Sequence, residues 1–361
     1  MEENGQHTFN EIKSQPAVWA DTLGVITAEA ERIRGAWAAL QPRHVLFIGC
    51  GSTHYLSLTA AAIFQMLTGL PSRAAPGSEL LLFPELLLTD PAHTLLIAIS
   101  RSGATTETLQ AVKRFRQLGG RSVWAITCYP ESDLAHTADL TLAAEAAQET
   151  SVAQTRSFSS MLLLAQGISA LIGGQDLALL TLLPDMVEKL MTDTAPLMET
   201  LGRRAELEEI FFLGSGPQYG VANEAMLKMK EMSLSHSEAF HFLEFRHGPV
   251  SVLGAESLVI GLLSQTALST EWRVLEEMAQ LGATVLEITP GAAMDGSAEK
   301  IQLPQDLPAW VSPVLYLPPL QLLAYYRTIT KQLDPDNPRH LQAVVTLESS
   351  QFEVQDPAAA R

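Results

Sequence analysis

The chain has 361 residues and a formal net charge of −17; 47% of the residues are hydrophobic and only 17% are charged. A length of this order suggests about two domains, each with its own core. The negative charge argues against a nucleic-acid partner, because phosphates need a Lys/Arg-rich surface, and it disfavours binding to anionic membranes.

Three apolar strands are predicted in the first half of the chain, over 45–49, 94–100 and 122–127. Two helices are predicted between them, a small-residue helix over 55–68 and a helix over 103–118. Strands that are apolar on both faces and alternate with helices indicate a parallel sheet with helices on both sides.

The same order of elements recurs in the second half. The segment 211–216 matches 46–51, the strand over 258–262 matches 95–99, and the strand over 284–289 repeats the third strand. A nearly constant offset between the matching segments points to two copies of one unit. The predicted fold class is α/β, with two tandem doubly wound parallel-sheet subdomains, each a three-layer α/β/α structure.

We expect five regions along the chain. They are an N-terminal helical segment (1–40), a first subdomain that binds the ligand (41–175), a linker helix (176–204), a second subdomain that carries the chemistry (205–340) and a C-terminal tail that closes the site (341–361), ending in a short Ala-rich stretch (356–361).

The N-terminal sequence, the length of the apolar runs and the cysteines indicate the cellular compartment. No basic region followed by an apolar run occurs at the N-terminus, so we expect no signal peptide. Apolar runs such as 161–164 are too short to cross a bilayer, which takes about 20 residues. The two cysteines, Cys50 and Cys128, suggest a reducing compartment rather than a disulfide framework. We therefore expect a cytoplasmic protein with no membrane partner.

A cluster of hydroxyl groups follows the second strand, where Ser100, Ser102 and Thr105 surround Gly103. A helix N-terminus offers free backbone N–H groups and a positive dipole end, and hydroxyls add further donors. The cluster therefore favours an anion such as phosphate, although a plain N-cap by Ser102 would explain one of the hydroxyls. The matching turn of the second half, 263–266, has no glycine.

The earlier glycine-rich turn, 49–54, invites comparison with a dinucleotide-binding motif. It lacks the third glycine of G-x-G-x-x-G, and no acidic residue follows about 20 positions further on. We therefore expect no cofactor. No HExxH motif and no Cys/His spacing indicates a metal site.

The segment 223–249 combines a charged helix with a histidine turn. Glu224, Lys228 and Glu231 stand at i, i+4 and i+7, on one helix face, and His247 lies in the turn that follows. A carboxylate, an amine and an imidazole can move protons at neutral pH. The same spacing also fits a solvated face with an ion pair of little energetic value, and His247 also fits a structural histidine.

Six motifs follow one another along the chain: Ile48-Gly-Cys-Gly-Ser-Thr, Ser100-x-Ser-Gly-x-Thr, Val152-Ala153-x-Thr155, Glu224–Glu231, Arg246-His-Gly-Pro and Asp334-Pro-Asp-Asn-Pro-Arg339. Together they resemble the sugar isomerase (SIS) family, and the resemblance covers about residues 12–348. The likeness is to the isomerase half of glucosamine-6-phosphate synthase, to aminosugar-phosphate deaminases and to fructosamine-6-phosphate deglycases.

The resemblance implies a phosphorylated sugar or aminosugar as ligand. It also implies a set of residues that bind this ligand: Ser52, Thr53, Ser100, Arg101, Ser102, Gly103, Thr105, Val152 and Gln154.

For catalysis, the resemblance implies that Glu231 is the base that moves a proton between C1 and C2, while Glu224 and Lys228 orient the site. His247 resembles the ring-opening residue, which the family supplies from the neighbouring subunit. A homodimer is therefore implied.

Departures from the family pattern suggest a different substrate. Ala343 stands where the synthase carries a C-terminal lysine, so we expect no lysine-assisted ring opening. No glutaminase domain with its N-terminal cysteine is found, so we expect no glutamine-driven amination. Arg101, Ala104, Gln154 and Arg156 also replace usual residues.

Three functions are open at this stage. The first is an isomerase that deaminates an aminosugar 6-phosphate, and the second is a deglycase that splits a 6-phosphorylated fructosamine. The turn Glu244-Phe-Arg-His-Gly-Pro resembles the deglycase subgroup. The third is a non-catalytic sugar-phosphate sensor, against which the presence of both Glu231 and His247 argues.

Overall fold

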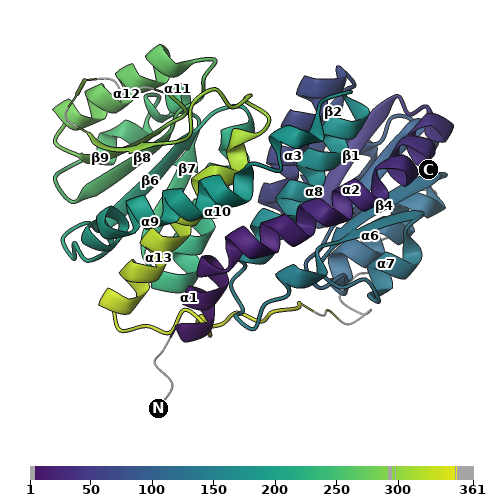
Figure 1. Cartoon of the computed structure of the whole chain (residues 1–361), viewed down its shortest axis with the longest axis horizontal. Helices are drawn as coiled ribbons and strands as arrows, with labels where there is room; N and C mark the ends of the chain where they lie inside the picture. Colours follow the sequence, from purple (N-terminus) through teal and green to yellow (C-terminus); the bar gives the residue numbers. More distant parts are fainter. Residues whose placement is uncertain (1–4, 292–294, 297, 346, 348–361) are drawn as a thin grey trace.

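Two five-stranded sheets, one in each half of the chain, form the framework of the computed structural model, which describes residues 5–291, 295–296, 298–345 and 347 (Figure 1). The strands are β1 (His44–Gly49), β2 (Ser72–Pro76), β3 (Thr94–Ile99), β4 (Ser122–Thr127), β5 (Leu140–Ala143), β6 (Glu209–Gly214), β7 (His236–Phe240), β8 (Ser257–Leu262), β9 (Thr284–Thr289) and β10 (Glu299–Gln302).

Helices cover both sheets. The α-helices are α1 (Gln6–Lys13), α2 (Gln15–Leu40), α3 (Ser52–Thr68), α4 (Gly77–Leu82), α5 (Pro84–Leu87), α6 (Thr106–Gln117), α7 (Asp133–Thr137), α8 (Arg156–Ile172), α9 (Leu183–Gly202), α10 (Pro217–Ser233), α11 (Phe242–Phe245), α12 (Leu268–Gln280) and α13 (Leu317–Thr330). Short 3-10 helices are η1 (Pro91–His93), η2 (Glu145–Ala147), η3 (Leu177–Leu179), η4 (Pro249–Val252) and η5 (Ser312–Tyr316).

The two sheets have the same topology. The order is β2-β1-β3-β4-β5 in the first and β10-β9-β8-β6-β7 in the second, so each half places its strands in the order 2-1-3-4-5. Every strand pair is parallel. The central strands β3 and β8 are buried along their whole length, as expected when helices cover both faces. The predicted tandem α/β fold is confirmed.

Two predicted helix starts are wrong. The helix α3 already begins at Ser52 rather than at 55, and α6 begins at Thr106 rather than at Gly103. The φ angle of Gly103 is +64°, which lies in the left-handed region and is incompatible with a helix. A side-chain hydroxyl, Ser100 Oγ, accepts the N–H of Gly103 at 3.1 Å instead. The hydroxyl cluster therefore forms a turn ahead of the helix.

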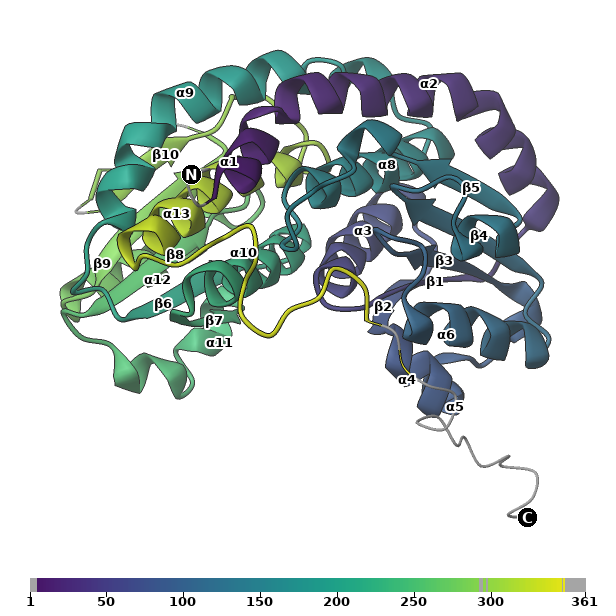
Figure 2. The ribbon, with the colours of Figure 1, turned by 90° about the horizontal axis from the view of Figure 1, so that it is seen from below.

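Helices α3 and α10, one from each half, pack against each other and join the two sheets. At their closest approach, a Cβ on Gly220 of α10 would lie 2.3 Å from Thr59 Oγ1 and 2.5 Å from the carbonyl oxygen of Tyr55. The long helix α2 packs on both α8 and α9 and so spans the two halves (Figures 1 and 2).

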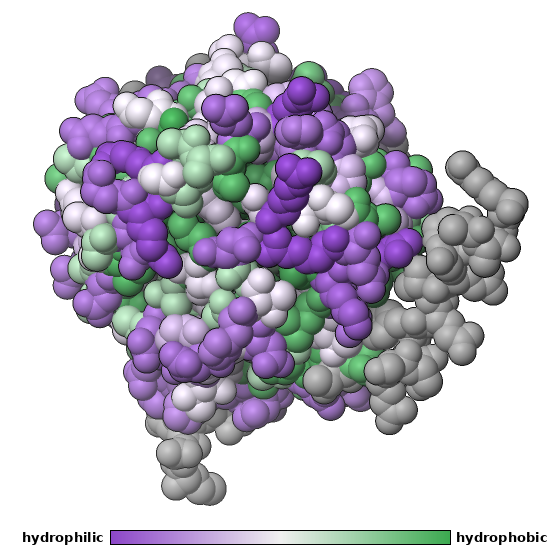
Figure 3. All heavy atoms as spheres, turned by 90° about the vertical axis from the view of Figure 1, so that its right-hand side faces the viewer, coloured by the Kyte–Doolittle hydropathy of each residue, from purple (hydrophilic) through white to green (hydrophobic). Residues whose placement is uncertain are grey.

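The segment that follows α13 leaves the second half and runs across to the first half, as Figure 2 shows. On the face of the first half drawn in Figure 3, hydrophilic side chains surround smaller apolar areas. No helix within the described residues is long and apolar enough to cross a bilayer.

We predict that Gly220→Ala lowers the free energy of unfolding by about 2 kcal/mol or more, because the new methyl group overlaps backbone atoms of α3 that cannot move independently. The control is Gly35→Ala in α2, where a Cβ has open space and the substitution should add about 0.5–1 kcal/mol. Denaturant unfolding of both variants measures the difference; equal effects would contradict the close packing of α3 on α10.

Candidate functional site

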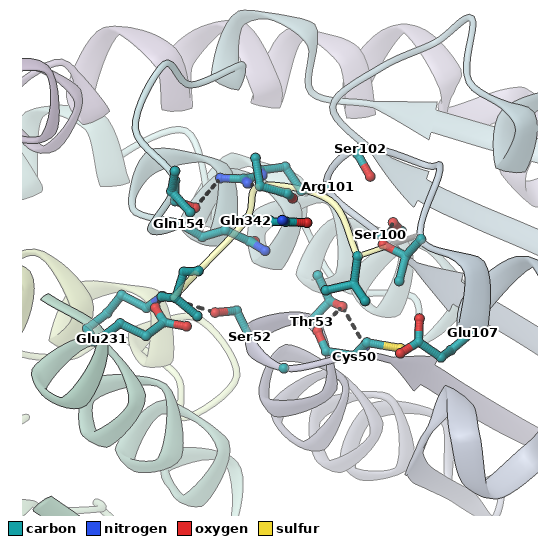
Figure 4. Close-up of a pocket in the computed structure, with 17 residues that line it drawn as sticks. Cys50, Ser52, Thr53, Ser100, Arg101, Ser102, Glu107, Gln154, Glu231 and Gln342 are labelled. Carbon is teal, nitrogen blue, oxygen red and sulfur yellow. Dashed lines mark hydrogen bonds and ion pairs between the residues drawn. The ribbon is translucent and has the colours of Figure 1, made fainter. Parts of the chain in front are cut away.

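A pocket of about 290 Å³ lies where the turns that follow β1 and β3 meet, with walls from both halves of the chain (Figure 4). Parallel α/β sheets bind ligands at such a crevice, outside the carboxyl ends of the strands where the strand order reverses. The lining residues are Cys50, Gly51, Ser52, Thr53, Ser100, Arg101, Ser102, Thr105, Glu107, Val152, Gln154, Lys228, Glu231, Leu341, Gln342, Ala343 and Val345.

The turn 100–105 presents its hydroxyl groups to this pocket. Ser100 Oγ lies 3.2 Å from Thr105 Oγ1, and Ser102 Oγ accepts the backbone N–H of Ala104 at 3.2 Å. The N-cap of α6 is Thr105, whose side chain caps no backbone group, so the alternative of a plain N-cap by Ser102 is wrong. Gly103 does not line the pocket; a Cβ there would lie 2.0 Å from Ser132 Oγ, so its role is to shape the turn.

At the other end of the pocket, α10 brings Glu224, Lys228 and Glu231 together with Ser52 at the start of α3. Lys228 Nζ contacts Glu231 Oε2 and lies 3.4 Å from Glu224 Oε1. The Ser52 hydroxyl donates to Glu224 Oε1 at 3.1 Å and accepts from Lys228 Nζ at 3.2 Å. The side chains of Glu224 and Lys228 are 0% and 2% exposed, whereas Glu231 is 17% exposed and lines the pocket.

The alternative of a solvated helix face is therefore wrong. Burial between α3 and α10 takes Glu224 and Lys228 out of water, which sequence spacing alone does not show. Burial raises the pKa of Glu224 to about 8, although Lys228 opposes the rise. Burial also opposes the charge on Lys228, but Glu224 and Glu231 outweigh it and raise the pKa of the ammonium. One ammonium thus lies between two carboxyl groups, of which Glu224 is the more deeply buried.

A buried ion pair organises the wall of the pocket between β5 and α8. Arg101 Nη1 lies 3.4 Å from Glu149 Oε2, and it donates to the carbonyl oxygen of Val152 at 3.0 Å. Glu149 Oε1 also accepts the backbone N–H and the hydroxyl of Thr155 at 2.7 and 2.8 Å, and Ser157 donates to the same carboxylate. Arg101 lines the pocket, but these guanidinium contacts are with the protein.

The N-terminal helix and the Asp334–Arg339 motif support this wall from behind. Asp336 accepts the backbone N–H groups of His7 and Thr8 in the first turn of α1, at 3.2 and 2.7 Å. Its backbone carbonyl accepts the N–H of Val152 at 3.1 Å. Glu11 Oε1 accepts the N–H of Thr150 at 2.6 Å. Elements from both chain ends therefore hold the loop that carries Val152 and Gln154.

The segment 341–345 covers part of the pocket. Arg101 Nη2 donates to the carbonyl oxygen of Ala343 at 3.1 Å, and the N–H of Thr106 donates to the carbonyl oxygen of Val345 at 3.4 Å. In the remainder of the predicted tail, Leu347 is described, and residues 346 and 348–361 lie outside the described residues.

His247 lies apart from this pocket. It is exposed, follows α11, and is not among the lining residues. The pocket of a single chain therefore contains the predicted carboxylate and amine without the predicted imidazole.

Several lining residues were not assigned to the site from the sequence. Cys50 lies inside the motif 48–53 and Glu107 lies two residues after the motif 100–105, so closeness to an assigned residue was the available signal. Gln342 and Val345 lie in the tail that was expected to close the site, but neither side chain was assigned a role there; both reach the pocket because the chain returns from the second half.

The family model for the SIS domain matches residues 40–168 and 205–330. The chain belongs to the SIS domain family. A relative in this family, glutamine–fructose-6-phosphate aminotransferase [isomerizing] of Clostridium perfringens, is 31% identical over 96% of this chain and 60% of its own length. The enzyme of the same name from Pyrobaculum aerophilum is 32% identical over 94% of this chain and 57% of its own length. The chain thus spans less than two thirds of either relative.

Two solved structures superpose over nearly the whole chain. Glucosamine-6-phosphate deaminase from Thermotoga maritima matches with a TM-score of 0.82 and 29% identity, covering 95% of this chain and 100% of that one. Tagatose-6-phosphate ketose/aldose isomerase from Escherichia coli matches with a TM-score of 0.85 over 96% and 98% of the two chains; at 23% identity this likeness shows the fold alone.

We predict that Glu224 makes the stability of this SIS protein fall as pH rises. Its pKa is higher in the folded chain than in the unfolded chain, so the stabilisation is fully present below about pH 4.5 and is lost as pH passes about 8. Between pH 5 and 8 the Glu224 carboxyl should account for roughly 3 kcal/mol of lost stability.

Glu224→Gln should remove this dependence, as measured by denaturant unfolding at several pH values. Glu131→Gln is the control, since the Glu131 carboxylate is 90% exposed. A Glu224→Gln variant whose stability falls with pH as steeply as that of the wild type would contradict the neutral, buried carboxyl.

Proposed function

We propose that this SIS protein is a phosphosugar isomerase and deaminase that acts on an aminosugar 6-phosphate by proton transfer between C1 and C2. The observation that carries the proposal is that Glu231, from the second half, and the hydroxyl-rich turn 100–105, from the first half, line one pocket. A phosphate held at the turn is remote from the reacting carbons, so its binding energy can orient them.

The phosphate end is the turn itself. Ser100, Ser102 and Thr105 supply hydroxyl donors, and the N-terminus of α6 adds the positive end of its dipole. The Thr53 hydroxyl closes its own turn, because it accepts the Cys50 N–H at 2.9 Å and donates to the Cys50 carbonyl at 3.0 Å. Ser52 and Thr53 therefore form the floor between the two ends.

The reacting end is Glu231. In the proposed reaction it removes the proton from C2 of the open-chain aminosugar and returns it to C1, while a second proton passes from the amine nitrogen to O1, which leaves a C1 alcohol and a C2=N imine. Water then adds to C2 and the C–N bond breaks, giving a ketose phosphate and ammonia. Lys228 holds the Glu231 carboxylate, and Glu224 keeps Lys228 in place. The general-base role needs only that Glu231 reach the bound carbons.

The histidine of the site comes, in this proposal, from a second copy of the chain. His247 is exposed and lies outside the pocket of its own chain. A residue that one subunit contributes to the pocket of its partner is expected to have both properties. A homodimer with twofold symmetry would supply one His247 to each pocket, where the imidazole would assist ring opening.

A deglycase acting on a fructosamine 6-phosphate is the alternative. There the proton would move from C1 to C2, the imine would form at C1, and hydrolysis would release an amine and an aldose phosphate. One feature of the pocket fits the deglycase as well as it fits the deaminase. Ala343 gives the segment over the pocket no side-chain amine, and neither proposed reaction uses an amine at this position.

A substrate panel distinguishes these functions. We expect ammonia release from glucosamine 6-phosphate, detected by a coupled assay, with formation of fructose 6-phosphate. Release of an amino acid from fructosyl amino acid 6-phosphates, without ammonia release from glucosamine 6-phosphate, would favour the deglycase. Binding of hexose phosphates without turnover of any compound would favour the sensor.

We predict that Glu231→Gln and His247→Asn each abolish turnover, and that mixing the two variants under subunit exchange restores about a quarter of wild-type activity, because half of the dimers would contain one intact site. Mixing Glu231→Gln with Lys228→Met is the control and should restore nothing, since these residues share one α10 helix. Absence of recovery in the first mixture would show that Glu231 and His247 act within one chain, whereas wild-type activity of His247→Asn by itself would show that His247 is not required.

A further inference from the structure

The centre of the pocket is lined by two carboxamides that come from distant parts of the chain. Gln154 precedes α8, and Gln342 lies on the segment that returns from the second half. Figure 4 shows both between Glu231 on one side and the Ser100–Ser102 turn on the other. The carbon chain of a ligand whose phosphate lies at the turn and whose reacting carbon lies at Glu231 must therefore pass these two amides.

We propose that Gln342 is a specificity-determining residue that binds the hydroxylated carbon chain of an open-chain sugar 6-phosphate, and that Arg101 is the positioning residue that holds Gln342 over it. This inference rests on the proposed function, because it takes the phosphate to lie at the turn 100–105.

The chemistry of the carboxamides fits a polyhydroxylated chain. A carboxamide offers two N–H donors and one carbonyl acceptor, and a sugar hydroxyl both donates and accepts. Gln154 Oε1 is buried and has no hydrogen-bond partner among the described residues, so it is an acceptor available to a ligand hydroxyl. The charged groups Glu231 and Lys228 are paired with each other at one end, and Arg101 is paired with Glu149 in the wall, so the two carboxamides present neutral polar groups between the ends.

Arg101 fixes the position of Gln342 through the backbone of the next residue. Its Nη2 donates to the carbonyl oxygen of Ala343 at 3.1 Å. Thr106 adds two bonds further along, because its N–H donates to the carbonyl oxygen of Val345 at 3.4 Å and its hydroxyl accepts the N–H of Leu347 at 3.1 Å. The segment is thus held on the turn 100–106 itself.

The contacts of Arg101 support positioning rather than direct binding. Its side chain is 8% exposed, and the guanidinium donates to the carbonyl oxygens of Ser151 and Val152 as well as to that of Ala343. Glu149 balances its charge. One planar fork therefore joins the anion turn, the loop that carries Gln154 and the segment that carries Gln342. Lysine has no such fork, so it cannot hold these acceptors together.

The test measures binding without turnover. Sorbitol 6-phosphate, an acyclic hexitol phosphate that has no carbonyl group to react, and inorganic phosphate are each titrated calorimetrically into the wild type, Gln342→Ala, Arg101→Lys and the double variant. Gln117→Ala is the matched control, since Gln117 is exposed at the far end of α6. Circular dichroism and thermal melting verify that each variant folds.

We expect Gln342→Ala to weaken sorbitol 6-phosphate about tenfold, the value of about one hydrogen bond, and to leave inorganic phosphate unchanged. Arg101→Lys should cause a similar selective loss. The double variant should lose no more than the larger single effect, because Arg101 acts through Gln342. Gln117→Ala should change neither affinity.

Three results would overturn the inference, and they are distinguishable. Unchanged sorbitol 6-phosphate affinity in Gln342→Ala, with selective wild-type binding of this hexitol over phosphate, would overturn the role of Gln342 while the proposed function stands. Additive losses in the double variant would overturn the positioning role of Arg101. Failure of the wild type to bind either compound would overturn the proposed function itself. If Arg101→Lys does not fold, the Gln342→Ala titration still decides the specificity role.

Discussion

The buried ion pair between Arg101 and Glu149 is the interaction on which the geometry of the pocket depends. Two charges in a protein interior lose their hydration, and their attraction compensates for this loss only when further hydrogen bonds satisfy both groups. Here Thr155 and Ser157 satisfy the carboxylate, and backbone carbonyls satisfy the guanidinium. Because those partners lie on two separate segments and Arg101 itself lies on a third, the requirement to satisfy one buried charge pair also fixes the positions of three walls of the site.

The duplicated fold supplies two equivalent crevices, but the two halves use them differently. In the first half, the turn after β3 leaves its hydroxyl groups facing the pocket. In the second half, the turn after β8 is closed by its own helix, because the buried carboxylate of Glu271 accepts the backbone N–H of Ser264 at 2.6 Å. A side-chain carboxyl group that accepts a hydrogen bond thus lies where the first half presents donors. The second half contributes instead through α10, whose charged face packs on the start of α3.

Sequence reasoning recovered the fold because its signals are local and repeated. Buried parallel strands are apolar along their length, and the recurrence of the same order in both halves made the pattern redundant. Edge strands such as β2 and β10 are shorter and partly polar, so they escaped prediction. The start of α6 was misplaced because the left-handed conformation of Gly103 depends on contacts with Ser100 and Ser132, which are not visible in a helical pattern.

In the candidate site, too, some features could be predicted from the sequence and others could not. The residue types at the turn 100–105 and along 224–231 follow from the linear chain, because spacing along a turn or a helix brings them together. Burial of Glu224 and Lys228, the position of Gln342 over the pocket and the distance of His247 from it depend on how the two halves pack and on where the chain returns. Those features arise between segments more than a hundred residues apart, so short-range periodicity carries no information about them, and only the folded arrangement of both halves determines them.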